Sequence, residues 1–295
     1  MSTRSTSASI SSQQEPSDNT STNCSLHATC DESCSESSET AVASLCSPRP
    51  SRSRKTTTSS SSASPAQQVS AVPPSIFAQH FNNKGVKALN YGNYRKAINL
   101  FVKAIQALND AGTDDYCQCE HCRVFSSVHH TLVQDAKTNA YDTSDDHYVH
   151  RRGISIRPEA MGHKMGGALL QIATLNLAIT KHLICLECPL SDERAQAKKY
   201  QKAASFYEMA FKSHVGESQD QNTVNIAFFL IIVNNLAQIH READNRSKEI
   251  MCRDHLQSAL MTLLTNNEDT ELYHSLDLDG FCRTAFSTAI CASAA

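Results

Sequence analysis

Apolar residues recur at helical spacing, three or four positions apart, in two neighbouring stretches between about residues 75 and 110. Pro73-Pro74-Ser75 stops any earlier helix and offers a capping hydroxyl, so a first helix is predicted from about 75 to 90. Tyr91-Gly92-Asn93 then marks a turn, and a second helix follows with its apolar positions on one stripe. Two helices joined by a tight turn form an antiparallel hairpin.

Two later stretches repeat this organisation in a lengthened form. A long apolar helix is predicted from near Gly167, and its partner helix contains Tyr200 to Ala210. The stretch Glu187 to Ala197, which contains a proline, is either a lengthened loop or an extension of both helices with a turn at the proline. The run Ile226 to Val233 is apolar on all sides, as expected of a helix packed on two sides, and begins a third hairpin.

The three hairpins share an Asn-x-small step in the first helix and a small-x3-large-x2-Ala ladder in the second. The copies are Asn83-Lys84-Gly85 with Ala97, Phe101 and Ala104; Asn176-Leu177-Ala178 with Ala203, Tyr207 and Ala210; and Asn235-Leu236-Ala237 with Cys252, Leu256 and Ala259. Small residues let the two helices cross closely, and the large residue fills the space beside the crossing. Replacing Gly85 with leucine is therefore predicted to break this packing.

The first hairpin closely resembles the tetratricopeptide repeat family. The matching residues are Phe81, Gly85, Gly92, Tyr94, Ala97, Phe101 and Ala104, which agree with the family motif in residue class and spacing. The resemblance is looser over about 166 to 265. It implies an all-α fold, namely a short, irregular tetratricopeptide-like array of antiparallel helical hairpins that bury their core by stacking on one another.

A last amphipathic helix is predicted from about Thr270 to Ile290, interrupted near Asp279-Gly280. Its apolar positions Leu272, Leu276, Phe281 and Phe286 are expected to face the hairpins. Such a helix would cap the exposed edge of the array.

The N-terminal residues have a composition that cannot form a core. Residues 1–70 contain no Phe, Tyr, Trp or Gly, and 32 of the 70 are Ser or Thr, so little apolar area offsets the chain entropy of folding. We therefore predict a disordered Ser/Thr-rich tail over residues 1–72 and a helical domain over 73–295. A flexible insert is predicted within that domain at about 111–160, where apolar periodicity is weak.

Charge and signal content restrict the function and the compartment. A net charge of -3 and a pI near 6.5 provide no field for holding a nucleic-acid backbone. The first residues lack the apolar core of a secretory signal, and the longest apolar run has eight residues, too short to span a membrane. An intracellular protein, cytoplasmic or nuclear, is expected, with neither a nucleic-acid nor a membrane partner, and its cysteines are expected to be reduced.

No catalytic motif is present: the chain has no G-x-S-x-G, no phosphate-binding glycine loop, no H-E-x-x-H and no G-x-G-x-x-G. A non-enzymatic protein without a cofactor is expected. The insert contains Cys117, Cys119 and Cys122 near several histidines, which supports a second hypothesis of a metal-binding or redox-sensing protein. The C-x-C-x-x-C spacing has no second well-spaced pair, so cysteines without metal are the expected state. The later pair Cys185 and Cys188 is interpreted as small buried residues of an apolar helix.

In tetratricopeptide proteins the first helix of each hairpin lines a concave face, and the resemblance places ten residues there. They are Gln79, Asn82, Val86, Asn90, Leu175, Ile179, His182, Asn234, Gln238 and Arg241. Mixed amide and aliphatic side chains suit an extended or helical peptide whose backbone the amides can bind. The alternative is that these residues pack against the insert or the capping helix.

One tetratricopeptide subclass holds the C-terminal carboxylate of chaperones through a lysine and an asparagine of the first hairpin. At the matching places this chain has Asn82 and Val86, which argues against that partner. The resemblance thus predicts a non-enzymatic scaffold that binds a segment of another protein in its concave face, with a partner outside the chaperone class.

Overall fold

The computed structural model describes residues 74–111, 148–163, 165, 167–217, 226–265 and 278–286. In these residues the chain forms seven α-helices, one short 3-10 helix and no β-strand, so the all-α prediction is confirmed. The helices are α2 (Pro74–Asn90), α3 (Tyr94–Ala111), α5 (Gly167–Glu187), α6 (Glu193–Glu217), α7 (Ile226–Glu242), α8 (Arg246–Thr265) and α10 (Leu278–Phe286), and the 3-10 helix η3 spans Pro158–Ala160. The predicted tail at 1–72 lies outside the described residues, as do 112–147 of the predicted insert.

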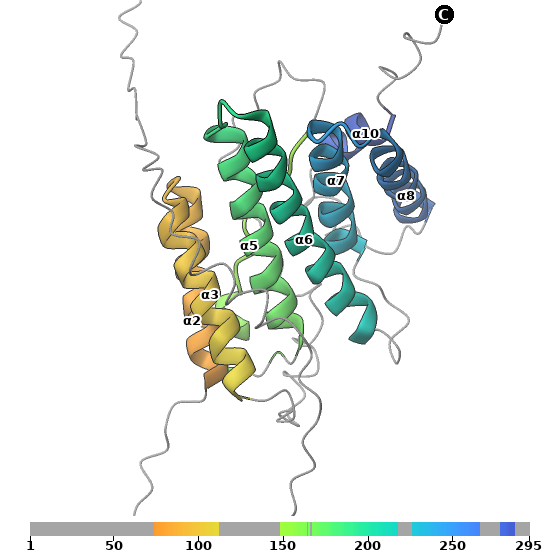
Figure 1. The fold of residues 1–295 in the computed structure, drawn as a ribbon. Coiled ribbons are helices and arrows are strands. Elements are labelled where there is room, and N and C mark those ends of the chain that lie inside the picture. Colours follow the sequence, from red (N-terminus) through yellow and green to blue (C-terminus); the bar gives the residue numbers. More distant parts are fainter. Residues whose placement is uncertain are drawn as a thin grey trace, which may run out of the picture. The chain divides into compact units, whose positions relative to one another are not determined.

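Six of the helices form three hairpins, α2 with α3, α5 with α6 and α7 with α8 (Figure 1). The hairpins are joined side by side, because α3 packs on α5 and α6 packs on α7. The last helix, α10, packs against both α8 and α7. A single cluster of buried apolar side chains runs through all of these contacts.

The first and third hairpins close through the same turn. Gly92 has φ 69° and Asp244 has φ 53°, so both occupy the left-handed region, which glycine and aspartate tolerate better than most residues. In each hairpin the next residue is an asparagine whose side-chain oxygen accepts a backbone N–H of the following helix, from Lys96 to Asn93 at 3.3 Å and from Lys248 to Asn245 at 3.4 Å. The turn chemistry therefore repeats although the residue in the left-handed region changes.

The small and large ladder positions meet where the helices of the first hairpin cross. A Cβ atom added at Gly85 would lie 2.5 Å from Cε1 of Phe101, which is far closer than real side-chain contacts. Phe101, Tyr207 and Leu256, the large residues of the three ladders, are all fully buried. The predicted packing role of the ladder is thus what the structure shows for the described hairpins.

The second hairpin is lengthened by helix, not by loop. Helix α5 ends at Glu187 and α6 begins at Glu193, so the extension of both helices is the correct alternative. Gln196 closes the turn, since its side chain accepts the Leu190 N–H at 3.1 Å and donates to the Cys185 carbonyl at 2.8 Å. Among the described residues, α5 alone is long and apolar enough to cross a membrane, but 78% of the relevant stretch is buried inside the protein.

Helix α10 begins at Leu278, directly before Asp279-Gly280, and the part of the predicted last helix that precedes it lies outside the described residues, so the interruption near this pair stays a prediction. Phe281 faces the hairpins and is fully buried, as predicted, whereas Phe286 is exposed. Leu272 and Leu276 lie outside the described residues. Gly280 lies in the first turn of α10, and its missing side chain makes room for the ring of Tyr148.

Candidate functional site

A non-helical segment of the chain, residues 148–157, lies across one face of α2, α5 and α7; we call it the groove segment. It is the yellow-green segment in Figure 1. Burial nearly alternates along it: Tyr148, His150, Ile154 and Ile156 are buried, and their neighbours are more exposed, as in an extended chain. The sequence pattern placed these residues in a flexible insert; the structure instead holds them against the helices, because their side chains bury apolar area and their backbone groups find partners.

Three asparagines bind the backbone of this segment in the same way. In each case the side-chain oxygen accepts the N–H of one segment residue and the side-chain amide donates to the carbonyl of that same residue. Asn235 binds His150 at 2.9 and 2.9 Å. Asn176 binds Ile154 at 2.7 and 2.9 Å, and Asn83 binds Ile156 at 2.8 and 2.9 Å. We call these three contacts, each between one asparagine side chain and the backbone of one segment residue, the asparagine pairs. The three asparagines are the first residues of the three Asn-x-small steps.

Neighbouring amides connect the asparagine pairs into a buried network. Asn82 donates to the Ile154 carbonyl at 3.0 Å and accepts a hydrogen bond from Asn176 at 2.9 Å. In the third hairpin, Asn234 donates to the Tyr148 carbonyl at 3.1 Å, and Asn235 also donates to the Tyr207 hydroxyl at 2.8 Å. Burial raises the pKa of Tyr207 far above its usual value, so this hydroxyl stays protonated. A buried network of this kind fixes one arrangement, since each lost partner leaves a polar group away from water.

Gln79 extends the contacts beyond the groove segment to the residues that precede α5. Its side-chain oxygen accepts the Gly162 N–H at 2.8 Å, and its amide donates to the His163 carbonyl. Val86 lines the face beside Gly153, where an added Cβ would lie 3.0 Å from Val86 Cγ2. The segment therefore runs from the third hairpin to the first, opposite to the order of the hairpins in the chain.

Aromatic side chains hold the N-terminal end of the groove segment against α10. The Tyr148 ring lies over Gly280 and packs edge-on against Phe281, with ring centroids 5.2 Å apart. The His150 ring lies nearly parallel to that of Phe281 at 6.3 Å, and its Nδ1 is 3.3 Å from the Tyr148 hydroxyl. The Tyr148 carbonyl also accepts a hydrogen bond from Thr284 at 3.4 Å.

The asparagine pairs contact only backbone atoms of the segment, so their geometry can hold an extended chain of varied sequence. No protein-family model, no curated protein and no solved structure matches this chain.

Of the ten residues predicted to line a binding face, the structure brings four to the groove segment and its continuation: Gln79, Asn82, Val86 and Asn234. Gln238 instead donates to Thr284 of α10 at 3.3 Å. The alternative stated for the sequence, packing against the insert or the capping helix, describes these five contacts.

The other five predicted residues lie elsewhere. Leu175 and Ile179 are fully buried in the core, and His182 packs against the rings of Tyr200 and Tyr207 of α6. Asn90 is exposed at the end of α2, and Arg241 is half-buried near the end of α7.

The three asparagines of the asparagine pairs were missing from the predicted site, although their step had identified the repeat. The signal for them was present in the sequence: a polar amide that recurs beside a close helix crossing has a function in each copy. The residues predicted to line the concave face were instead neighbours of these asparagines on the same helices. In the second hairpin the predicted residue was Leu175, and the residue that binds the segment is Asn176.

The cysteines of the metal hypothesis, Cys117, Cys119 and Cys122, lie outside the described residues. Within the described ranges, no three His, Cys, Asp or Glu side chains are grouped to hold a metal ion. Cys185 is a buried free thiol, and burial raises its pKa to about 11. Cys188 is disulfide-bonded, so the expectation of reduced cysteines is wrong at this position.

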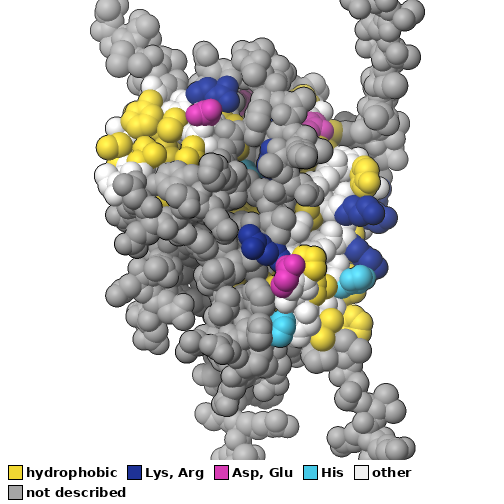
Figure 2. Space-filling view, turned by 180° about the vertical axis from the view of Figure 1, so that it is seen from behind, with side chains coloured by type: hydrophobic (Ala, Val, Ile, Leu, Met, Phe, Trp, Pro, Cys, Tyr) yellow, Lys and Arg dark blue, Asp and Glu magenta, His cyan; other side chains and the backbone are white. Residues whose placement is uncertain are grey.

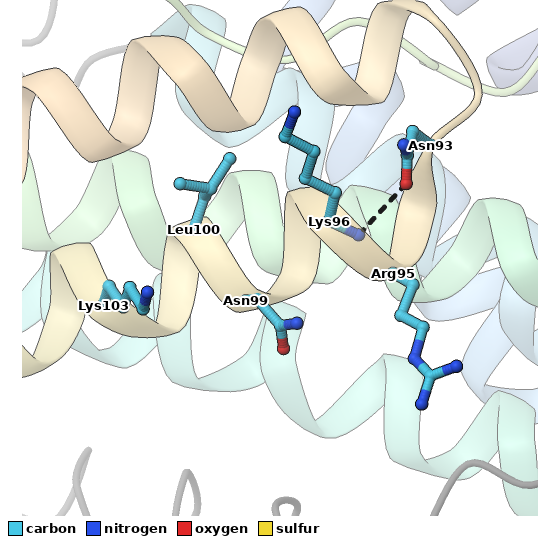
Figure 3. Close-up of a pocket in the computed structure, with 6 residues that line it drawn as sticks. All are labelled: Asn93, Arg95, Lys96, Asn99, Leu100 and Lys103. Atoms are coloured by element: carbon cyan, nitrogen blue, oxygen red, sulfur yellow. Dashed lines mark hydrogen bonds between the residues drawn. The ribbon is translucent and has the colours of Figure 1, made fainter.

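A shallow depression of about 440 Å³ lies on α3, formed by Asn93, Arg95, Lys96, Asn99, Leu100 and Lys103. Figure 3 shows their side chains spread along one helix without converging on a common point. This surface is basic but offers no enclosed position for a ligand. The asparagine pairs remain the best-organised polar site of the described chain.

On the face drawn in Figure 2, the exposed apolar side chains of the described residues lie in more than one place, with charged side chains beside them. On α8, Met261 and Leu264 share a helical stripe with Ile250, but the exposed Asp254 and Gln257 lie between them.

His182 makes stability depend on pH. It is fully buried, neither ring nitrogen has a hydrogen-bond partner, and burial, with the nearby Arg151 charge, lowers its pKa from 6.5 to about 3. Below pH 6.5 the unfolded chain binds a proton that the folded chain does not. Stability is therefore lost as the pH falls from 6.5 towards 3, by up to about 1.4 kcal/mol per pH unit from this group.

We expect His182→Leu to leave stability at pH 7.5 unchanged or slightly higher, because it removes unpaired polar atoms at similar volume. At pH 5 the variant should be about 2 kcal/mol more stable than the parent chain. Urea unfolding at the two pH values measures this difference. The exposed His255→Leu serves as the control and should match the parent chain at both. Equal pH dependence in His182→Leu and the parent would refute the assignment.

Proposed function

We propose that the three hairpins form a short tetratricopeptide-like array that acts as a non-enzymatic protein-interaction scaffold. Its concave face is the face formed by α2, α5 and α7. The ligand is an extended segment of a protein, held by its backbone. The near-neutral charge of the chain argues against nucleic acid as the partner.

The observation that carries this proposal is the repetition of the asparagine pairs. Each hairpin contributes one asparagine that binds both backbone groups of a single residue, at 2.7 to 2.9 Å. Main-chain hydrogen bonds provide affinity for an extended peptide in other modes of peptide recognition, while side-chain pockets provide selectivity. Repeat arrays bind in the same manner along an extended surface.

The present occupant is the chain's own groove segment, and this determines how a partner binds. A tethered occupant competes at an effective concentration of about a millimolar. Substituting an asparagine weakens the binding of the occupant and the binding of the partner by the same interactions. The apparent affinity for a partner therefore changes little. A test must therefore weaken the occupant first. Tyr148→Ser combined with His150→Ser, the release variant, removes two buried side chains of the occupant without changing the face.

We expect panning of a random 12-residue peptide library on the full-length release variant to enrich specific binders. Adding Asn235→Leu to the release variant should reduce their binding at least tenfold, because two backbone hydrogen bonds are lost. Adding Asn90→Leu, at an exposed position of α2, should have no effect. The absence of enriched peptides, or binding that is indifferent to Asn235→Leu in a chain of unchanged helicity, would refute the groove.

A further inference from the structure

We propose, on the basis of the proposed function, that the end of the groove between α7 and α10 is an exchangeable subsite for an aromatic side chain. Its ligand is an extended protein segment with an aromatic residue two positions before the residue that pairs with Asn235. Residues 148–150 are the built-in occupant, and such a ligand displaces them. We call this place the aromatic subsite; it comprises Asn234, Asn235, Gly280, Phe281 and Thr284.

The two ends of the groove segment differ in how firmly the chain holds them. Ile154 and Ile156 are buried, and the chain continues through buried Ala160 and Met165 directly into α5. In the parent chain this half is therefore anchored beside the second hairpin. The residues that follow His150 are less buried: Arg151 is exposed, and its ion pair with Glu187, at 3.9 Å, is largely solvated. Residues 148–150 can therefore detach while 154–156 stay in place.

Gly280 shows that the subsite is shaped for a ring. Glycine in a helix is less stable than alanine, so its use in the first turn of α10 calls for a reason. Here a Cβ would overlap the Tyr148 ring, and Phe281 presents its own ring at right angles to it. The missing side chain and the facing aromatic together form a slot that an aliphatic or charged residue fills poorly.

The built-in occupant leaves one buried polar atom unused. Asn234 donates to the Tyr148 carbonyl and to the Asn235 oxygen at 3.0 Å, but its own side-chain oxygen is buried without a partner. A buried acceptor without a donor destabilises the folded state, because it has lost its hydrogen bonds to water. A ligand that brings an N–H or O–H to this oxygen removes this destabilisation. The subsite can therefore bind another ligand more tightly than it binds the built-in occupant. This is the condition for displacement.

The test uses fluorescence anisotropy of a labelled peptide with the sequence of residues 145–153, added to the full-length chain. The release variant lacks the competing tyrosine and histidine, so it should bind the peptide at least tenfold more tightly than the parent chain. Serine in place of the peptide's tyrosine should weaken binding to the release variant at least tenfold. Circular dichroism should show that the parent and the release variant are equally helical.

Gly280→Ala, added to the release variant, tests the slot itself. It should weaken the tyrosine peptide at least tenfold but leave the weak binding of the serine peptide unchanged, because only a ring meets the new methyl group. Arg283→Ala, at an exposed position of the same helix, is the matched control and should affect neither peptide.

Equal binding of the tyrosine and serine peptides, or equal binding of the parent chain and the release variant, would overturn the aromatic subsite. If panning yields Asn235-dependent peptides that lack an aromatic residue, the scaffold function stands and the aromatic subsite falls. If no peptide of any sequence binds, both fall.

Discussion

Asn176→Leu is expected to destabilise the folded chain by about 3 kcal/mol. Leucine has a similar shape but neither donates nor accepts, so the buried N–H of Ile154 and the side-chain oxygen of Asn82 each lose a partner. The Ile154 carbonyl keeps its hydrogen bond from Asn82. Two orphaned groups at about 1–3 kcal/mol each set the size of the effect, and detachment of the groove segment limits it, since the freed groups then reach water.

Thermal unfolding and hydrogen exchange together measure this prediction. The loss corresponds to a fall in Tm of about 6–12 °C for a domain of this size. Amide exchange at residues 150–156 should accelerate more than exchange in α5 itself, because the segment is released before the helix unfolds. Asn90→Leu, on the exposed end of α2, should change neither quantity by more than the experimental error. Uniform acceleration across α5 would show a general packing defect instead.

Gly85→Leu is expected to destabilise the first hairpin by about 3 kcal/mol or more. A single Cβ at this position would already lie 2.5 to 2.9 Å from three atoms of the buried Phe101 ring, and leucine adds three more carbons. Phe101 cannot move aside, since Ala97 and Ala104 beside it are fully buried too. Urea unfolding measures the loss, and Lys84→Leu on the exposed side of the same helix should be within about 0.5 kcal/mol of the parent chain.

A double variant separates this contact from a general effect on the helix. Phe101→Ala alone leaves a cavity and is expected to cost about 3–5 kcal/mol. Combined with Gly85→Leu, the leucine side chain fills part of that space, so the two losses should be less than additive by at least 1 kcal/mol. Full additivity would mean that Gly85 and Phe101 do not share one packing site.

The helical hairpins could be predicted from the sequence because their signals are local. Periodic apolar positions, Gly92 at a turn and the ladder around Phe101 each act within one hairpin, over separations of less than about twenty residues. The alternative of longer helices around Pro189 also followed from residues in that turn. Such elements are specified by neighbours in the chain, so one stretch of sequence suffices to recognise them.

The groove segment could not be recognised in this way because its partners are distant. Asn83 binds a residue 73 positions away, and Asn235 binds one 85 positions away. The segment itself has no helical period, and its three buried apolar side chains are spaced like those of an ordinary loop. Only the recurring asparagines indicated that something extended crosses the three hairpins.

The contact of Gly280 with Tyr148 could not be recognised for the same reason. Within the local sequence, Asp279-Gly280 is a typical helix-breaking pair. The glycine also serves a tertiary contact with Tyr148, which lies 132 residues earlier in the chain. The need for a residue without a side chain at this position is therefore apparent only when the remote ring is in place.

The course of the groove segment also changes how the array unfolds. Stacked repeats ordinarily contact only their neighbours, so they can melt from the ends one unit at a time. Here the groove segment is hydrogen-bonded to the first, second and third hairpins at once. Opening any one hairpin weakens the binding of the segment to the other two. The array is therefore expected to melt in one concerted transition, with slow formation because contacts over 70 residues apart must close first.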